Sequence, residues 1–119
     1  MKIIILNGEL RSGMQMYLAL SNHYKVEVAL DDNDLMRLLE AETTDYTFLE
    51  LDEEDSNCVN PKKFEIVDKI LKKYPKTKVV GICDQNNQNI KNNISLHGIN
   101  KVLIKPIKNR DLFETIESN

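Results

Sequence analysis

The sequence has few of the residues that cross-link small domains or build metal sites. It contains two cysteines, Cys58 and Cys83, and two histidines, His23 and His97, all separated along the chain, and it has no tryptophan. The cysteines form no C-x-x-C pair, and neither histidine has a neighbouring metal-ligand partner. The sequence therefore predicts neither a zinc site nor a disulfide framework.

Long apolar runs are also missing. The apolar stretch at the amino terminus ends at Leu6, before Asn7 and Gly8, and is too short for a secretory signal or a membrane span. With no such segment and no disulfide framework, we expect a cytoplasmic protein that makes no membrane contact.

Neither sign of charge dominates. The chain has 16 basic and 19 acidic residues and a formal net charge of -3. This balance gives no electrostatic case for direct binding to nucleic acid. At 119 residues the chain fits one domain, residues 1–119, with enough buried surface for a core.

What the sequence does contain is a series of short apolar runs that alternate with segments of helical spacing. The runs predict five strands, at residues 2–6, 26–30, 46–51, 78–83 and 101–104. Strands that alternate with helices indicate βαβ units, so the sequence predicts a doubly wound, parallel (βα)5 α/β domain with helices on both faces.

Apolar spacing also predicts which side of each helix faces inward. The first helix, between residues 7 and 24, is expected to bury Leu10, Met14, Tyr17, Leu18 and Leu20. The second is expected to be capped by Asp34, with Asp31 and Asp32 as alternatives. Its expected inward residues are Leu35, Leu38 and Leu39.

The third helix has the clearest start, because Asn60 supplies a cap before Pro61. Its buried residues are expected to be Phe64, Val67, Ile70 and Leu71, and Tyr74-Pro75 is expected to end it. A fourth helix is predicted between residues 85 and 97, ended by Gly98. A last helix is predicted from Asn109, with Leu112, Phe113 and Ile116 inward.

Two charged residues follow apolar runs at the ends of predicted strands. Glu50 lies near the end of the third strand, and Lys105 follows the fifth, just before Pro106. The carboxyl ends of parallel strands form the crevice where ligands bind in open α/β sheets. We therefore expect these two side chains to face one another.

On these residues the whole chain resembles the receiver domains of bacterial two-component response regulators. The strongest parts are the apolar strand that ends at Glu50, where the family has its phospho-accepting aspartate, and the stretch from Gly98 to Lys105-Pro106. The resemblance implies a flavodoxin-like three-layer sandwich with strand order 2-1-3-4-5. It also implies a function in signal transduction rather than catalysis.

When the family's functional residues are assigned to the matching positions of this sequence, the pocket that they imply is altered. Glu50 replaces the acceptor aspartate, Cys83 stands where receivers have a hydroxyl, and Val102 stands where they have a switch aromatic. Only Lys105 matches in kind. The degenerate receiver pocket then consists of Asn7, Gly8, Glu9, Asp52, Cys83 and Lys105.

These changes predict that phosphorylation has been lost. Phosphoryl transfer depends on the positions of acceptor, metal and lysine, and the extra methylene of Glu50 moves the acceptor oxygen. Asn7 and Gly8 offer no carboxylate to Mg²⁺, so we expect weak or absent magnesium binding and no other cofactor. If Glu50 reaches Lys105 at ~4 Å, their attraction locks one conformation without a kinase, or the pair is merely structural.

The resemblance also suggests partners. Receivers often dimerise through the face built from helix four, strand five and helix five, and control an attached effector such as a transcription regulator. The short predicted last helix, residues 111–118, favours a natural protein that continues beyond residue 119.

Other functions stay open. The first is a working phosphotransfer receiver with unusual pocket residues, and the second is redox sensing through Cys83, although a packed core cysteine is favoured. The glycine spacing of residues 8–13 is that of a P-loop, but Met14 and Gln15 replace its lysine and hydroxyl. The acidic residues within 50–55 lack the spacing of a calcium loop. A flavin site is not favoured, because the hydroxyl-rich phosphate loop that it would need after the first strand is missing.

Overall fold

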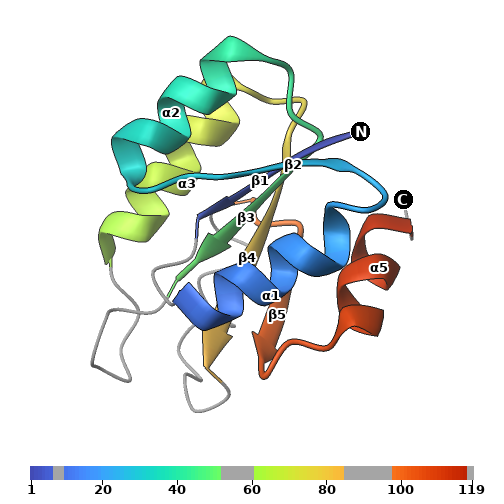
Figure 1. Ribbon diagram of the computed structural model, residues 1–119. Coiled ribbons are helices and arrows are strands. Elements are labelled where there is room, and N and C mark those ends of the chain that lie inside the picture. Colours follow the sequence, from blue (N-terminus) through green and yellow to red (C-terminus); the bar gives the residue numbers. More distant parts are fainter. Residues whose placement is uncertain (7–9, 52–60, 85–97, 118–119) are drawn as a thin grey trace.

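The computed structural model describes residues 1–6, 10–51, 61–84 and 98–117 (Figure 1). Five parallel strands form one sheet in the order β2-β1-β3-β4-β5. Their bounds are β1 Lys2–Leu6, β2 Lys25–Val28, β3 Tyr46–Glu50, β4 Lys78–Asp84 and β5 Lys101–Lys105. The predicted fold class and strand order are confirmed.

Helices cover both faces of the sheet. Helices α1 (Leu10–Leu20) and α5 (Asn109–Glu117) lie on one face, and α2 (Asp32–Ala41) and α3 (Pro61–Lys73) lie on the other (Figure 1). The predicted fourth helix, residues 85–97, lies outside the described residues. None of the helices in the described ranges combines the length and the apolar character that crossing a membrane requires.

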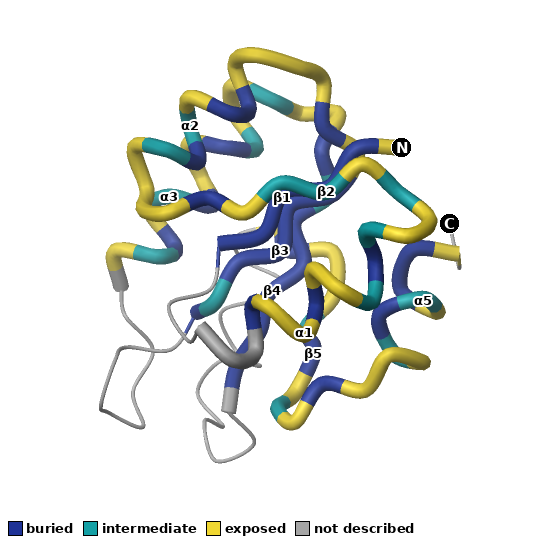
Figure 2. Tube along the Cα trace, in the orientation of Figure 1, coloured by how far each residue is buried: buried dark blue, intermediate teal, exposed yellow. Residues whose placement is uncertain are grey.

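The central strands are buried on both sides, as a parallel sheet between two helical layers requires. In β1, Ile3 and Ile5 face the core beside α1 and α5, whereas Ile4 faces the core beside α2 and α3, and all three are fully buried. Figure 2 shows this burial concentrated in the middle strands. Each fully buried side chain of this size stabilises the fold by about 1.5–3 kcal/mol.

The start of α2 corrects one prediction. The cap is Asp31, whose carboxylate accepts a hydrogen bond from the Asp34 backbone nitrogen at 2.8 Å. Asp34, the preferred candidate in the sequence, instead accepts from the Leu30 backbone nitrogen at 2.9 Å. The two aspartates thus satisfy one backbone donor each, and short sequence spacing alone does not distinguish their roles. The three leucines expected to face inward from α2 are buried.

The predicted inward face of α1 is wrong for three residues. Met14, Tyr17 and Leu18 have relative exposures of 55%, 40% and 62%, whereas Met16 and Leu20 are buried. Apolar side chains lie on two sides of this helix, and only the side with Met16 and Leu20 faces the sheet. Periodicity cannot select between two apolar sides.

The predictions for α3 and α5 are confirmed except at Leu71, which is only partly buried against the same core. Phe64, Val67 and Ile70 are buried, α3 begins at Pro61, and it ends at Lys73, before Tyr74-Pro75. The proposed cap, Asn60, lies outside the described residues. In α5, Leu112 and Ile116 are buried and Phe113 packs against the same core. Gly98 has a positive φ of 74°, which glycine adopts without strain.

Candidate functional site

The candidate site lies at the carboxyl edge of the sheet. Glu50 is the last residue of β3 and Lys105 is the last residue of β5, with β4 between these strands. Side chains alternate between the faces of a strand, so Glu50 shares a face with Phe48 and Lys105 shares one with Leu103. Phe48 and Leu103 both belong to the core beside α1 and α5, so the two charged residues lie on the same side of the sheet.

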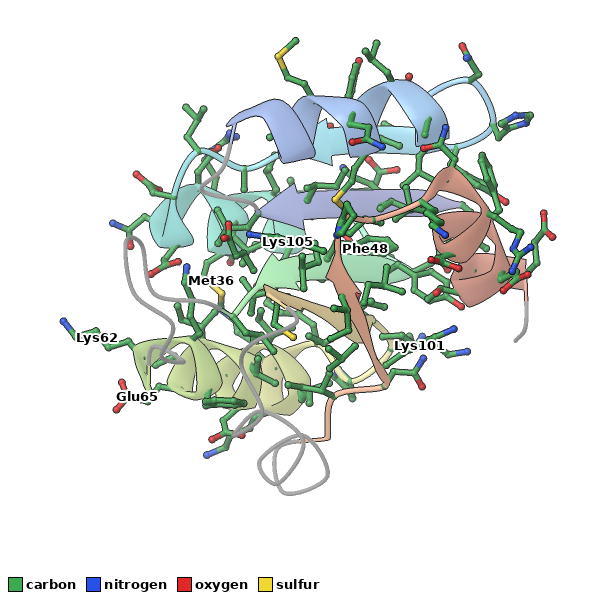
Figure 3. The ribbon with its side chains drawn as sticks, turned by 90° about the horizontal axis from the view of Figure 1, so that it is seen from below. Met36, Phe48, Lys62, Glu65, Lys101 and Lys105 are labelled. Atoms are coloured by element: carbon green, nitrogen blue, oxygen red, sulfur yellow. The ribbon has the colours of Figure 1, made fainter. Side chains whose placement is uncertain are left out.

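These two side chains form a short ion pair. The Lys105 Nζ donates a hydrogen bond to Glu50 Oε1 at 2.7 Å. The side chains are only 19% and 14% exposed, respectively. Figure 3 shows Lys105 beside the tips of the central strands. The contact expected between the two charges is therefore present.

The environment of the pair decides its strength. At 2.7 Å the Coulomb attraction is about 6 kcal/mol at an effective dielectric near 20, before desolvation of both groups is subtracted. Charge-assisted hydrogen bonds of this length are among the stronger polar contacts in proteins. The pair connects β3 to β5 across an intervening strand, so it couples two strands that share no backbone hydrogen bonds.

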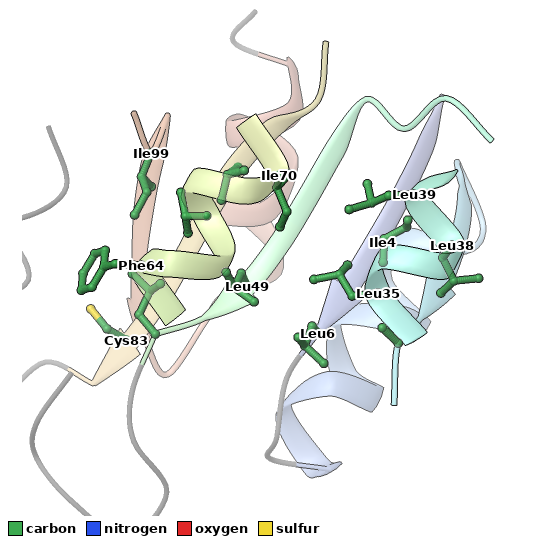
Figure 4. Close-up of a cluster of buried hydrophobic side chains, with 14 residues drawn as sticks. Ile4, Leu6, Leu35, Leu38, Leu39, Leu49, Phe64, Ile70, Cys83 and Ile99 are labelled. Atoms are coloured by element: carbon green, nitrogen blue, oxygen red, sulfur yellow. The ribbon is translucent and has the colours of Figure 1, made fainter. Parts of the chain in front are cut away.

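Cys83 occupies a different environment. It is fully buried in the core beside α2 and α3, in the same cluster as Leu49, Leu51 and Phe64 (Figure 4). Leu49 faces the opposite side of the sheet from Phe48, and so Cys83 lies across the sheet from the face that carries Glu50. The packed core cysteine favoured by the sequence is confirmed.

Val102 also packs against the core beside α2 and α3, and is half-buried. It lies opposite Gly81 in the β4–β5 register, where the chain packs closely: a Cβ added to Gly81 would lie 2.5 Å from Leu51 Cδ1. A valine is stiff about χ1 and cannot swing between inward and outward positions as an aromatic ring can.

The structure therefore brings together Glu50 and Lys105 from the predicted set. Four predicted pocket residues lie outside the described residues: Asn7, Gly8, Glu9 and Asp52. Within residues 1–6, 10–51, 61–84 and 98–117, no three His, Cys, Asp or Glu residues gather in a way that suits a metal ion.

Two features near the pair were not selected from the sequence. Asp84 lies directly opposite Lys105 in the β4–β5 register. It directly follows the predicted strand that ends at Cys83, and this place at a strand end is the sequence signal that could have drawn attention to it. Gln15 Nε2 donates to the Ile107 carbonyl oxygen at 3.2 Å and ties α1 to the segment after the cis Lys105–Pro106 peptide bond. No sequence pattern indicated that contact.

Solved structures of response regulators and of their receiver domains share this architecture. A response regulator from Thermotoga maritima superposes with a TM-score of 0.84 at 17% identity, covering 98% of this chain and 94% of that one. A CheY-like receiver domain protein from Methanospirillum hungatei JF-1 gives 0.82 at 19% identity, with 98% and 90% covered. The chain also matches NtrX from Brucella abortus, solved with ADP, with a TM-score of 0.85 at 19% identity.

The coverage of NtrX is unequal, with 98% of this chain but 25% of NtrX included. No family model matches the sequence, and no curated protein matches it either. At these identities the comparison establishes the fold, which is the CheY-like receiver fold.

Proposed function

We propose that the chain is a receiver-like signalling domain that works through protein contacts and does not depend on phosphorylation. The observation that carries this proposal is the 2.7 Å ion pair between Glu50 and Lys105 at the carboxyl edge of a receiver fold. Under this proposal the domain catalyses no reaction.

A phosphorylated receiver needs its lysine to meet the incoming phosphoryl oxygen. Here the ammonium of Lys105 already donates to the residue at the acceptor position, Glu50. Phosphorylation would have to break this hydrogen bond. It would also have to occur on a carboxylate oxygen that the extra methylene of glutamate moves away from the usual acceptor position. The sequence also has Asn7 and Gly8 where receivers have their metal-binding carboxylates, so we expect weak or absent Mg²⁺ binding.

The same pair supports a fixed state. The Glu50 carboxylate reaches farther than that of an aspartate, so it partly imitates an acyl phosphate, with about half its charge. Bonded to Lys105, it holds the ends of β3 and β5 in one arrangement. The domain then presents its recognition surface continuously, without a kinase.

Its partner is a protein, either a second copy that uses the face of the fourth helix, β5 and α5, or an effector such as a transcription regulator. The predicted fourth helix lies outside the described residues, so this dimer face rests on the resemblance to receivers. That this chain matches a quarter of NtrX supports an attached effector. Such a protein would act in the cytoplasm.

The test is phosphate uptake. The protein is incubated with acetyl phosphate and Mg²⁺ and its intact mass is measured, in parallel with Glu50→Asp and with an ordinary receiver domain as positive control. We expect the control to gain a phosphate and this chain to gain none. A phosphate on Glu50 would overturn the proposal and favour a working phosphotransfer receiver. Uptake by Glu50→Asp alone would show that the acceptor change is the main block.

A further inference from the structure

Large apolar side chains are exposed mainly along one edge of the molecule. In the described part of the chain, five of the seven exposed large hydrophobic residues lie around β2. They are Met14, Tyr17 and Leu18 on α1, and Val28 and Leu30 at the end of β2 and just after it. Apolar side chains gathered at one place on a surface mark an interaction site more often than scattered ones do.

A groove of about 500 Å³ runs over this edge. Met14 and Tyr17 of α1, Val26 and Val28 of β2, and Arg37 and Leu38 of α2 line it. Figure 1 shows β2 in front of the sheet between α1 and α2, and Figure 2 shows β2 partly to fully exposed. The groove therefore lies along a sheet edge, between two helices on opposite faces.

Within the described part of the chain, β2 has no neighbouring strand on its outer side. Hydrogen bonds from Lys25 N to Met1 O at 3.1 Å and from Ala29 N to Ile5 O at 2.8 Å direct alternate peptide groups toward β1. The intervening peptide groups, at Val26 and Val28, point away from β1, and β2 is the terminal strand in the sheet order. An edge of this kind is a template for another strand.

We propose that β2 pairs antiparallel with β2 of a second copy of this chain, about a two-fold axis at Val26. In this register the two Val26 residues exchange N–H to carbonyl hydrogen bonds, as a hydrogen-bonded antiparallel pair does. Lys25 of each copy lies opposite Glu27 of the other, and Tyr24 lies opposite Val28. The strand is thus complementary to itself in both charge and apolar character, as a two-fold interface requires.

The charges on the α2 side of β2 fit this arrangement. Lys25 Nζ lies 2.7 Å from Glu42 Oε2, and Lys2 Nζ lies 3.3 Å from Glu27 Oε1. Each copy therefore brings lysines and glutamates in alternation to the seam, and no charge meets its like across the axis at the Lys25 and Glu27 positions. Asp34 and Arg37 pair with each other at the rim of the groove, at 2.6 Å.

The apolar side of the seam explains the two apolar sides of α1. A two-fold axis perpendicular to the sheet places α1 of both copies on one face, flanking the β2–β2 seam. Met14, Tyr17 and Leu18 then lie against the same residues of the second copy, whereas Met16 and Leu20 remain in each monomer's core. A foreign partner would have no reason to match this self-complementary strand, so a second copy is the occupant that fits.

The first test is the oligomeric state by sedimentation velocity across protein concentration. We expect wild-type dimers, and we expect Met14→Lys/Leu18→Lys to raise the dimer dissociation constant about tenfold or more, since each change places a charge at an apolar contact. Ile104→Lys, at an exposed apolar residue of β5 on the opposite edge of the sheet, tests the alternative dimer face, and we expect it to leave the β2 dimer intact. Thermal melts should show all variants folded.

The outcomes separate this interface from the β5 face of the proposed function. A wild type that stays monomeric at high micromolar concentration would overturn the β2 dimer, and so would dissociation by Ile104→Lys but not by Met14→Lys/Leu18→Lys. None of these results depends on whether Glu50 accepts phosphate.

The second test fixes the register by cross-linking in a Cys58→Ser background. Residues of a hydrogen-bonded antiparallel pair have Cα atoms about 5.5 Å apart, within the roughly 4.4–6.8 Å that a disulfide spans. Val26→Cys should therefore form a covalent dimer under mild oxidation, whereas Val28→Cys, on the same strand and side, should not. Cross-linking by Val28→Cys in place of Val26→Cys, or by neither variant, would overturn the proposed pairing.

Discussion

Lysine–carboxylate pairs lie at both ends of the sheet, yet the two ends differ in what those pairs connect. At the amino end, Lys2 Nζ lies 3.0 Å from Glu42 Oε2 and 3.3 Å from Glu27 Oε1, and Lys25 Nζ shares the same Glu42 oxygen. At the carboxyl end, among the described residues, Glu50 pairs with Lys105. A short, sheltered ion pair is therefore no mark of function by itself in this molecule.

What distinguishes the carboxyl end is its place in the fold. The network at the amino end ties β1 and β2, adjacent strands, to the region after α2, so it reinforces connections that the backbone already makes. The Glu50–Lys105 pair bridges strands that are not neighbours, at the edge where parallel sheets bind ligands. On this difference we base the proposal of a structural role at the amino end and a conformational role at the carboxyl end.

The largest effect is expected from Lys2→Met. Lys2 is only 5% exposed, and its removal leaves Glu27 and Glu42 without their buried cation. We expect a loss of about 2–4 kcal/mol in the free energy of unfolding, measured by urea denaturation. Lys25→Met is the matched control, because Lys25 is 59% exposed, and its loss should be much smaller than that of Lys2→Met. Equal losses of unfolding free energy in the two variants would show that burial of the lysine does not determine its contribution to stability at this end of the sheet.

A smaller loss is expected from Glu50→Gln, because the amide oxygen can still accept a hydrogen bond from Lys105 while the attraction between the two charges is lost. We expect about 1–2 kcal/mol in urea denaturation. Hydrogen exchange should accelerate at the ends of β3 and β5 but not at β2. Lys105→Met completes a double-mutant cycle, and additive effects of the two changes would remove the case for a coupled pair.

The effect of pH should arise at the amino end and at the start of α2. Hydrogen bonds from Lys25 and Lys2 hold the pKa of Glu42 below its usual 4.5, and the Leu30 backbone N–H and then Arg37 hold the pKa of Asp34 below 3.8. A lowered carboxyl pKa contributes stability that is present above the ordinary pKa and is lost as the pH falls through the folded one.

The melting temperature should therefore fall as the pH drops below about 4.5, and less so in Glu42→Gln. At the other extreme, the hydrogen bond to Glu42 raises the pKa of Lys25 above 10.5, so its contribution is lost only as the pH rises beyond that value. If Glu42→Gln left the fall in melting temperature at acid pH unchanged, Glu42 would not be a source of that fall.

The smallest effect is expected for thiol labelling. Cys83 is fully buried between the sheet and α3, so a Cys58→Ser variant should label slowly in native buffer and fast in urea. Fast native labelling would restore redox sensing as a candidate function.

The sequence predicted the fold well because its signals were strong and local. Five apolar runs, the Pro61 start of α3 and the leucine spacing of α2 each had one interpretation that fitted a parallel sheet. The meeting of Glu50 and Lys105 was also predictable, since strand order and strand ends determine it. The cap of α2 was less certain because Asp31, Asp32 and Asp34 all have suitable side chains.

Which side of α1 faces the sheet could not be predicted from the sequence, for a physical reason. Its residues are apolar on two sides, and the side that faces the sheet depends on how the helix packs over β1 and β2. The contact from Gln15 to the Ile107 carbonyl is likewise set by tertiary packing, between residues 92 positions apart.

The central claim is that Glu50 and Lys105 hold one state that needs no phosphoryl group, and beryllofluoride tests it most directly. This mimic of a phosphoryl group, added with Mg²⁺ to isotopically labelled protein, reports binding through amide chemical shifts. The account predicts no saturable shift at residues 50, 84 and 105. A saturable, magnesium-dependent shift centred on those residues would contradict it.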